Sequence, residues 1–220
     1  GLPLDVAVVS KITLPWNTEA GYGAVAFDGT VRLNQAMIDQ VRLGQAEVEA
    51  GKAKTAEKVS QRARALRGDH PLPDLGGKAA VVVDDGLASG FTMFTAIDAL
   101  KNLGADRIIV AVPTAHADAA AAVAEQADTV YCANVRSGMR FAVAEAYEHW
   151  YDISETEVIE MMRAHQSDHR SGSYFISASE NHSEALSRRI YFCTLPLAVM
   201  GKERWGCKAG TEAFYDYEGK

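Results

Sequence analysis

The sequence predicts an α/β fold in which helices flank a mostly parallel, open sheet. Short runs rich in β-branched residues recur at 79–83, 107–112 and 129–132, and helix-forming stretches separate them. The first two runs lack polar alternation, which is typical of strands buried on both faces of a parallel sheet. Strands that alternate with helices at this spacing indicate βαβ units.

The composition is that of one globular domain with some residues to spare. The chain has 220 residues, of which 48% are hydrophobic and 23% are charged. This length can bury a single good core. Its formal net charge of −7 argues against a surface that binds nucleic acid.

Neither a membrane segment nor a metal or disulfide framework is evident. No apolar run approaches the roughly 20 residues that span a bilayer, and no signal peptide is visible. Cys132, Cys193 and Cys207 are odd in number and include no CxxC pair, which argues against disulfides and a zinc site. We therefore expect a cytoplasmic protein without a nucleic-acid or membrane partner.

The first part of the chain is expected to form a strand and then a hairpin. Residues 4–9 are an apolar run typical of a buried strand, and residues 12–20 are expected to be a loop. The runs 22–27 and 30–33 flank an Asp-Gly pair, which favours a tight hairpin turn.

Residues 34–77 are expected to form a helical hood. Asn34 suits the N-cap of a helix that ends near Leu43. Residues 45–66 are rich in helix formers but have a thin apolar stripe, which predicts a long, largely exposed helix. Its cations are most simply a solvated face, and alternatively a mobile hood that reaches a polyphosphate. They are Lys52, Lys54, Lys58, Arg62, Arg64 and Arg67.

Three further helices and a tail are expected. The helix at 92–103 ends before Gly104, a helix at 115–127 starts at Pro113-Thr114, and Ser154-x-x-Glu157 is a capping box for a helix that ends near His165. Beyond it the short apolar pieces lack a clear period. We expect one domain at 1–165, followed at 166–220 by an appendage or poorly ordered tail.

The stretch 79–92 carries the clearest chemistry. The apolar run ends in Asp84 and Asp85, and small residues then lead into a helix. Open α/β sheets bind ligands at the carboxyl ends of their strands. The amides that open the helix suit a phosphate, and Gly86 and Gly90 allow close approach. The carboxylates suit sugar hydroxyls or the water shell of a magnesium ion, so the loop matches a ribose 5-phosphate.

Two other interpretations of this stretch stay open. The first is a tight acidic turn between a strand and a helix, without a ligand. The second is a receiver-type acidic pocket, which also places paired Asp residues at a strand end. The receiver-type pocket does not require the Ser-Gly-x-Thr sequence at residues 89–92, and we rank it lower for that reason.

The pattern resembles the phosphoribosyl pyrophosphate (PRPP) signature of type I phosphoribosyltransferases. The resemblance implies that Asp84 and Asp85 hold the ribose 2- and 3-hydroxyls and that the following loop holds the 5-phosphate. An aliphatic residue is commoner than Gly86 at its position. The PRPP-binding residues implied in this way are Asp84, Asp85, Gly86, Ala88, Ser89, Gly90, Phe91 and Thr92.

Further stretches extend the resemblance to about residues 2–165. They are similar to a group of predicted bacterial and archaeal phosphoribosyltransferases of undefined base specificity. The stretches are Val8-Val9-Ser10-Lys11, Pro15-Trp16-Asn17-x-Glu19, Gly23-Ala24-Val25-Ala26, the basic helix, Asp74-Leu75-x-Gly77-Lys78 and Ala111-Val112-Pro113.

The resemblance implies an enzyme that transfers the phosphoribosyl group of PRPP to a nitrogenous base or an amine and releases pyrophosphate. Its cofactor would be Mg²⁺, bound mainly through PRPP and water near Asp84 and Asp85. The catalytic candidates are Asp84, Asp85 and Lys11. Lys11 matches a basic residue of the family that would face the pyrophosphate. A solvent-facing lysine at a strand end is the alternative for Lys11.

Other expectations concern the leaving group and the acceptor. In this group an earlier strand carries an Arg-Gly-Gly type loop for pyrophosphate, and we expect that segment to be missing here. A non-catalytic PRPP- or nucleotide-binding module, regulatory or degraded, is therefore the alternative function. No general base is evident. His116 and Asp118 are candidates to touch the acceptor, Tyr147, His149 and Trp150 are weaker ones, and a homodimer is an open option.

Overall fold

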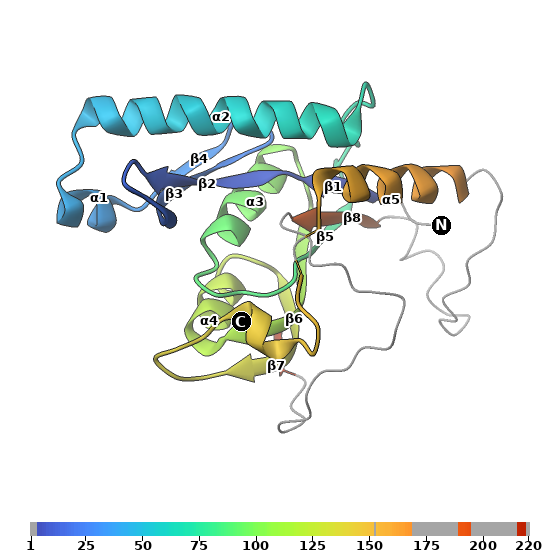
Figure 1. Ribbon diagram of the computed structural model, residues 1–220. Helices are drawn as coiled ribbons and strands as arrows, with labels where there is room; N and C mark the ends of the chain where they lie inside the picture. Colours follow the sequence, from blue (N-terminus) through green and yellow to red (C-terminus); the bar gives the residue numbers. More distant parts are fainter. Residues whose placement is uncertain (1–3, 152, 169–188, 195–214, 219–220) are drawn as a thin grey trace.

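The computed structural model describes residues 4–151, 153–168, 189–194 and 215–218, and Figure 1 shows their arrangement. Its main sheet has the strand order β1-β8-β5-β6-β7-β9, and every neighbouring pair is parallel except β7 and β9. This confirms the predicted α/β class with a mostly parallel sheet. The strands are β1 (Leu4–Ala7), β5 (Ala79–Val83), β6 (Arg107–His116), β7 (Thr129–Arg136), β8 (Arg189–Thr194) and β9 (Tyr215–Glu218).

Strand β8 comes from the segment in which we expected an appendage or a poorly ordered tail. It lies between β1 and β5, and its Cys193 is level with Val6 on one side and Val83 on the other. These residues are therefore part of the main sheet, a placement that no local pattern could predict from so far along the chain. The other residues beyond 168, apart from β9, lie outside the described part, so the domain division at residue 165 stays a prediction.

A second, antiparallel sheet contains β2 (Val9–Leu14), β3 (Asn17–Ala26) and β4 (Val31–Leu33). The expected loop at 12–20 is wrong, because β2 and β3 pair across most of that range with irregular register beyond Ile12. Burial explains the difference, since Ile12 and Tyr22 are almost fully buried. The predicted hairpin of β3 and β4 is confirmed, and Gly29 takes the left-handed backbone angle that its turn requires, φ 91°.

The hood contains α1 (Gln35–Val41) and α2 (Gln45–Arg67), and α2 runs across the small sheet (Figure 1). Asn34 caps α1 as predicted, because its side chain accepts a hydrogen bond from the Met37 amide at 3.0 Å. At the other end of the hood, the Arg67 guanidinium donates to both carboxylate oxygens of Asp5 at 3.0 and 3.1 Å and to the Val6 carbonyl at 2.9 Å. The end of α2 is thereby fixed to β1.

The main core lies between the large sheet and two helices, α3 (Phe91–Asn102) and α4 (Ala117–Ala124). We expected Pro113-Thr114 to begin a helix, but these residues belong to β6, which pairs with β7 as far as His116 and Arg136. The turn η1 (Val143–Ala146) and α5 (Glu155–Asp168) follow. The predicted capping box of α5 is confirmed, since Ser154 and Glu157 exchange side-chain and backbone hydrogen bonds.

None of the helices in the described ranges combines the length and the apolar character that crossing a membrane requires.

Gly51 offers a test of the hood packing. A methyl group there would overlap the Tyr22 hydroxyl and lie 3.1 Å from the Ile12 Cγ2 atom. Although alanine is the better helix former by about 1 kcal/mol, overpacking costs about 1–3 kcal/mol. We therefore expect Gly51→Ala to lower the free energy of unfolding in urea by up to about 2 kcal/mol.

The control is the same substitution in a Tyr22→Phe background, which removes the overlapping oxygen. Most of the loss caused by Gly51→Ala should disappear there. An equal loss in both backgrounds would contradict the packing of α2 on Tyr22.

Candidate functional site

The site begins where β5 ends. Val83 is level with Ala111 of β6, and β6 continues beyond that level to His116. This extension gives the chain after β5 a backbone partner: the Leu87 amide donates to the Thr114 carbonyl at 3.0 Å, and the His116 amide donates to the Leu87 carbonyl at 2.8 Å. The acidic turn, residues 84–87, is therefore held against β6.

The two carboxylates of this turn lie in a half-buried environment. The Asp84 side chain accepts a hydrogen bond from the Asp85 amide at 3.0 Å. Burial raises the pKa of the Asp85 carboxyl to about 6, although hydrogen bonds from the Gly86 and Asp85 amides act in the opposite direction. Asp85 therefore ionises near neutral pH, and a ligand that donates hydrogen bonds or brings positive charge would favour its ionised form.

The chain after β7 covers the other side of the turn. The Tyr147 hydroxyl donates to the Asp85 carbonyl at 2.6 Å. A Cβ atom at Gly86 would lie 2.8 and 2.9 Å from the two Val143 methyl carbons and 2.9 Å from the Thr114 methyl. Gly86 is the position at which the sequence departs from the usual aliphatic residue, and the structure leaves no room there for a side chain.

The loop that follows leads into the amino end of α3. Ala88 and Ser89 are exposed, and Gly90 has the left-handed backbone angle φ 70° at the N-cap. The Ser89 hydroxyl accepts a long hydrogen bond of 3.4 Å from the Phe91 amide. The amides of the first helical turn have no acceptor within the helix and carry the positive end of its dipole. Phe91 and Thr92 begin this turn, so the loop is suited to an anion.

Lys11 lies on the small sheet. The expectation that it follows a single strand at 4–9 was wrong, because Lys11 is inside β2, opposite Ala24 of β3. Its side chain is exposed. Since Val6 and Val83 are level and two strand spacings are about 10 Å, β2 leaves the large sheet near the acidic turn.

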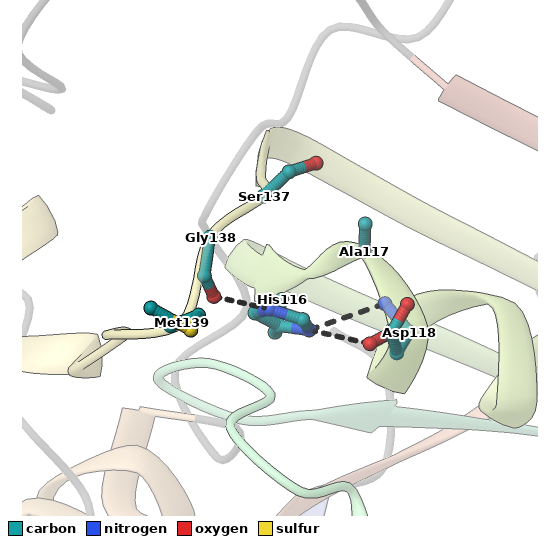
Figure 2. A pocket seen from close by; sticks show the side chains of 6 residues that line it. All are labelled: His116, Ala117, Asp118, Ser137, Gly138 and Met139. Atoms are coloured by element: carbon teal, nitrogen blue, oxygen red, sulfur yellow. Dashed lines mark hydrogen bonds and ion pairs between the residues drawn. The ribbon is translucent and has the colours of Figure 1, made fainter.

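A pocket of about 490 Å³ opens beside the turn, at the ends of β6 and β7. Figure 2 shows that the His116 ring lies between Gly138 on one side of the pocket and Asp118 on the other. Nε2 lies 3.0 Å from the Gly138 carbonyl and Nδ1 lies 3.2 Å from the Asp118 amide, so the bonding suits the neutral tautomer with its hydrogen on Nε2. The lining residues are His116, Ala117, Asp118, Ser137, Gly138 and Met139.

Comparison with known proteins decides the family. The family model described as "Phosphoribosyl transferase domain" matches residues 28–148. This range includes the acidic turn, the loop that leads into α3 and the residues that line the pocket. The chain belongs to the phosphoribosyl transferase domain family. Together with the PRPP signature, this match confirms the type I phosphoribosyltransferase resemblance.

Individual relatives agree with this assignment. Two Mycobacterium tuberculosis proteins, named "Putative phosphoribosyl transferase Rv0571c" and "Putative phosphoribosyl transferase MT0597", are each 34% identical over 165 residues. The match covers 74% of this chain and 37% of each relative, so the chain spans little more than a third of their length. The crystal structure of TT1426 from Thermus thermophilus is 28% identical, with a TM-score of 0.57 over 73% of this chain and 75% of that one.

The phosphoribosyltransferase fold brings most of the expected site residues together. Asp84, Asp85 and residues 86–92 form the turn and loop between β5 and α3, and His116 and Asp118 line the pocket that adjoins the turn. Their roles in binding stay predictions. The sequence did not reveal that Val143 packs against the turn or that Tyr147 bonds to it. The aromatic character of 141–151 was the only signal there.

The raised pKa of Asp85 predicts a stability change with a definite sign. In the folded protein the proton is held more tightly than at the ordinary value of 3.8, so the parent loses stability as the pH rises from about 4 through about 6. Asp85→Asn removes this loss. We expect its free energy of unfolding to exceed that of the parent by about 2–3 kcal/mol at pH 8.

The difference should vanish below about pH 4, where both side chains are neutral. Denaturant unfolding across this range measures it, with Asp69→Asn, at an exposed carboxylate, as the matched control. A parent that is as stable as Asp85→Asn at pH 8 would contradict the burial of this carboxylate.

Proposed function

We propose that the chain transfers the 5-phosphoribosyl group of PRPP to a nitrogen atom of a base or an amine and releases pyrophosphate. The observation that carries the proposal is the acidic turn, in which a half-buried carboxylate pair stands next to an exposed loop at the amino end of α3. A carboxylate pair accepts hydrogen bonds from adjacent sugar hydroxyls, and helix amides bind a phosphate. The membership of the phosphoribosyltransferase family supports this pairing.

In this proposal the protein acts by position and charge. Asp84 and Asp85 orient the ribose, and residues 88–92 hold the 5-phosphate, so that C1 of the sugar is presented to the acceptor. Positive charge that develops on the ribose lies near the carboxylates, and Lys11 would meet the pyrophosphate as it leaves. The exposed side chain of Lys11 in β2, the strand that leaves the large sheet near the acidic turn, supports that role.

In this proposal magnesium would reach the acidic turn together with the substrate. Within the described residues, no group of three or more His, Cys, Asp or Glu side chains could hold a metal ion. Mg²⁺ commonly binds through one or two carboxylates together with substrate phosphates and several waters. Asp84 and Asp85 would hold it in this way, and when bound it would neutralise charge on the pyrophosphate.

The pocket beside His116 is proposed to receive the acceptor. It adjoins the turn through the hydrogen bond between the His116 amide and the Leu87 carbonyl. Both nitrogens of the His116 ring are engaged by backbone groups, so the ring is not placed to remove a proton. This supports an acceptor whose nitrogen attacks without prior deprotonation.

Removing both carboxylates tests the donor site. We expect Asp84→Asn with Asp85→Asn to weaken binding of PRPP with magnesium by at least about 100-fold, since each hydrogen bond to a charged group contributes about 1.5–3 kcal/mol. Calorimetric titration measures this, and Asp69→Asn serves as the control. If the double variant binds PRPP as tightly as the parent, the ribose assignment is disproved. If the parent binds PRPP tightly but turns over no acceptor, the non-catalytic alternative is favoured.

Lys11 is tested by separating the two ends of the donor. We expect Lys11→Gln to raise the Kd for PRPP by about three- to tenfold at low salt, because a cation near pyrophosphate contributes about 1 kcal/mol. Binding of ribose 5-phosphate should not change, since it lacks the pyrophosphate. Arg107→Gln removes the same charge at the start of β6 and should alter neither. Equal effects of Lys11→Gln on both ligands would contradict a pyrophosphate contact.

A further inference from the structure

Three contacts join residues 141–147, which we name the covering segment, to the edge of the sheet. The Phe141 ring packs edge-on against His116, with centroids 5.8 Å apart and planes at 73°. The Val143 methyl groups fill the space where Gly86 would carry a Cβ atom. The Tyr147 hydroxyl donates to the Asp85 carbonyl at 2.6 Å. The covering segment thus contacts the acidic turn at two consecutive residues.

Asp85 and Gly86 belong to neither a helix nor a strand, so their backbone depends on other contacts to hold it in place. β5 ends at Val83. The Asp84 amide donates to the Ala111 carbonyl at 3.4 Å, and the bonds of Leu87 to β6 fix the far end of the turn. Between these points the direction of each Asp side chain depends on the backbone at 84–86. The Tyr147 bond fixes one carbonyl of this backbone, and Val143 closes on the neighbouring Gly86.

The ring of Tyr147 is itself held in place. It stacks edge-on against Trp150, with centroids 5.2 Å apart and planes at 65°. A tyrosine whose ring is fixed loses little further freedom when its hydroxyl bonds to the turn. The contact is therefore well suited to define the position of the turn.

We propose that Tyr147 is a positioning residue for the ribose end of the donor. By bonding the Asp85 carbonyl while Val143 packs on Gly86, it holds the two carboxylates where the sugar hydroxyls meet them. This inference rests on the proposed function, because it assigns the acidic turn to ribose.

The loop that leads into α3, which would hold the 5-phosphate, packs against residues other than those that contact the acidic turn. The two ends of the ligand can therefore be tested separately. A Cβ atom at Gly90 would meet the side chains of Val123 in α4 and Phe94 in α3 at 3.2 and 3.3 Å. The covering segment is not among these neighbours. Loss of the Tyr147 bond should therefore disturb the ribose contacts and leave the phosphate contacts intact.

The experiment measures two ligands with the Tyr147→Phe variant. We expect the Kd for ribose 5-phosphate to rise by roughly three- to tenfold, which corresponds to the loss of one hydrogen bond. The Kd for inorganic phosphate, measured by amide chemical shifts of the loop, should stay unchanged. Tyr151→Phe, at an exposed side chain, is the matched control and should alter neither value.

Two results would overturn the inference. The first is an unchanged affinity for ribose 5-phosphate in Tyr147→Phe. The second is an equal loss for both ligands, which would mean that Tyr147 only supports the fold. If the parent itself binds no ribose 5-phosphate, the proposed function fails and the inference falls with it; if the parent binds and Tyr147→Phe binds equally well, the inference alone fails.

A second pair of variants tests the Val143 contact without changing Tyr147. Gly86→Ala should raise the Kd for ribose 5-phosphate, since the new methyl group would press on Val143. Val143→Ala should recover part of this loss in the double variant, because it removes two of the three methyl carbons that the new group would meet, the third being that of Thr114. An additive loss in the double variant would contradict a positioning contact between the covering segment and the turn.

Discussion

The hydrogen bonds between Leu87 and the extended end of β6 are the constraint on which the site depends. Without them, the bond from the Asp84 amide to the Ala111 carbonyl, at 3.4 Å, would be the remaining backbone hydrogen bond between the turn and β6 among the described residues. With them, the acidic pair stays at the carboxyl edge, and the loop 88–90 arrives at α3 in a fixed position. The same extension carries His116 to the wall of the neighbouring pocket. One strand that extends beyond its neighbour therefore positions both the proposed donor site and the proposed acceptor pocket.

The placement of Asp85 lowers the stability of the folded chain. A carboxyl whose pKa burial raises to about 6 is partly desolvated before any ligand arrives. Large cores elsewhere offset this loss, together with fixed contacts such as that between Arg67 and Asp5. In the proposed function, a site arranged in this way before the ligand binds would need little reorientation. The conflict between local stability and ligand binding is what is expected of a functional site in a stable scaffold.

Local signals were sufficient for much of this structure. The buried run at β5, the Asn34 cap and the Ser154 capping box each depend on residues close together in sequence, and each formed as predicted. The errors came from long-range packing. Pro113 resembles a helix start, yet pairing with β7 keeps it in a strand. β8 takes its place only because β1 and β5 flank it, and the contact of Tyr147 with Asp85 joins residues too distant for any spacing rule.

The central claim is that the turn and loop at 84–92 form a ribose phosphate site. Backbone amide shifts of the isotope-labelled chain, followed by NMR during titration with ribose 5-phosphate, test it most directly. We expect saturable shifts that are largest at residues 84–92 and extend to the Tyr147 side of the turn. Shifts confined to the basic face of α2, or no saturable shift at the turn, would contradict it.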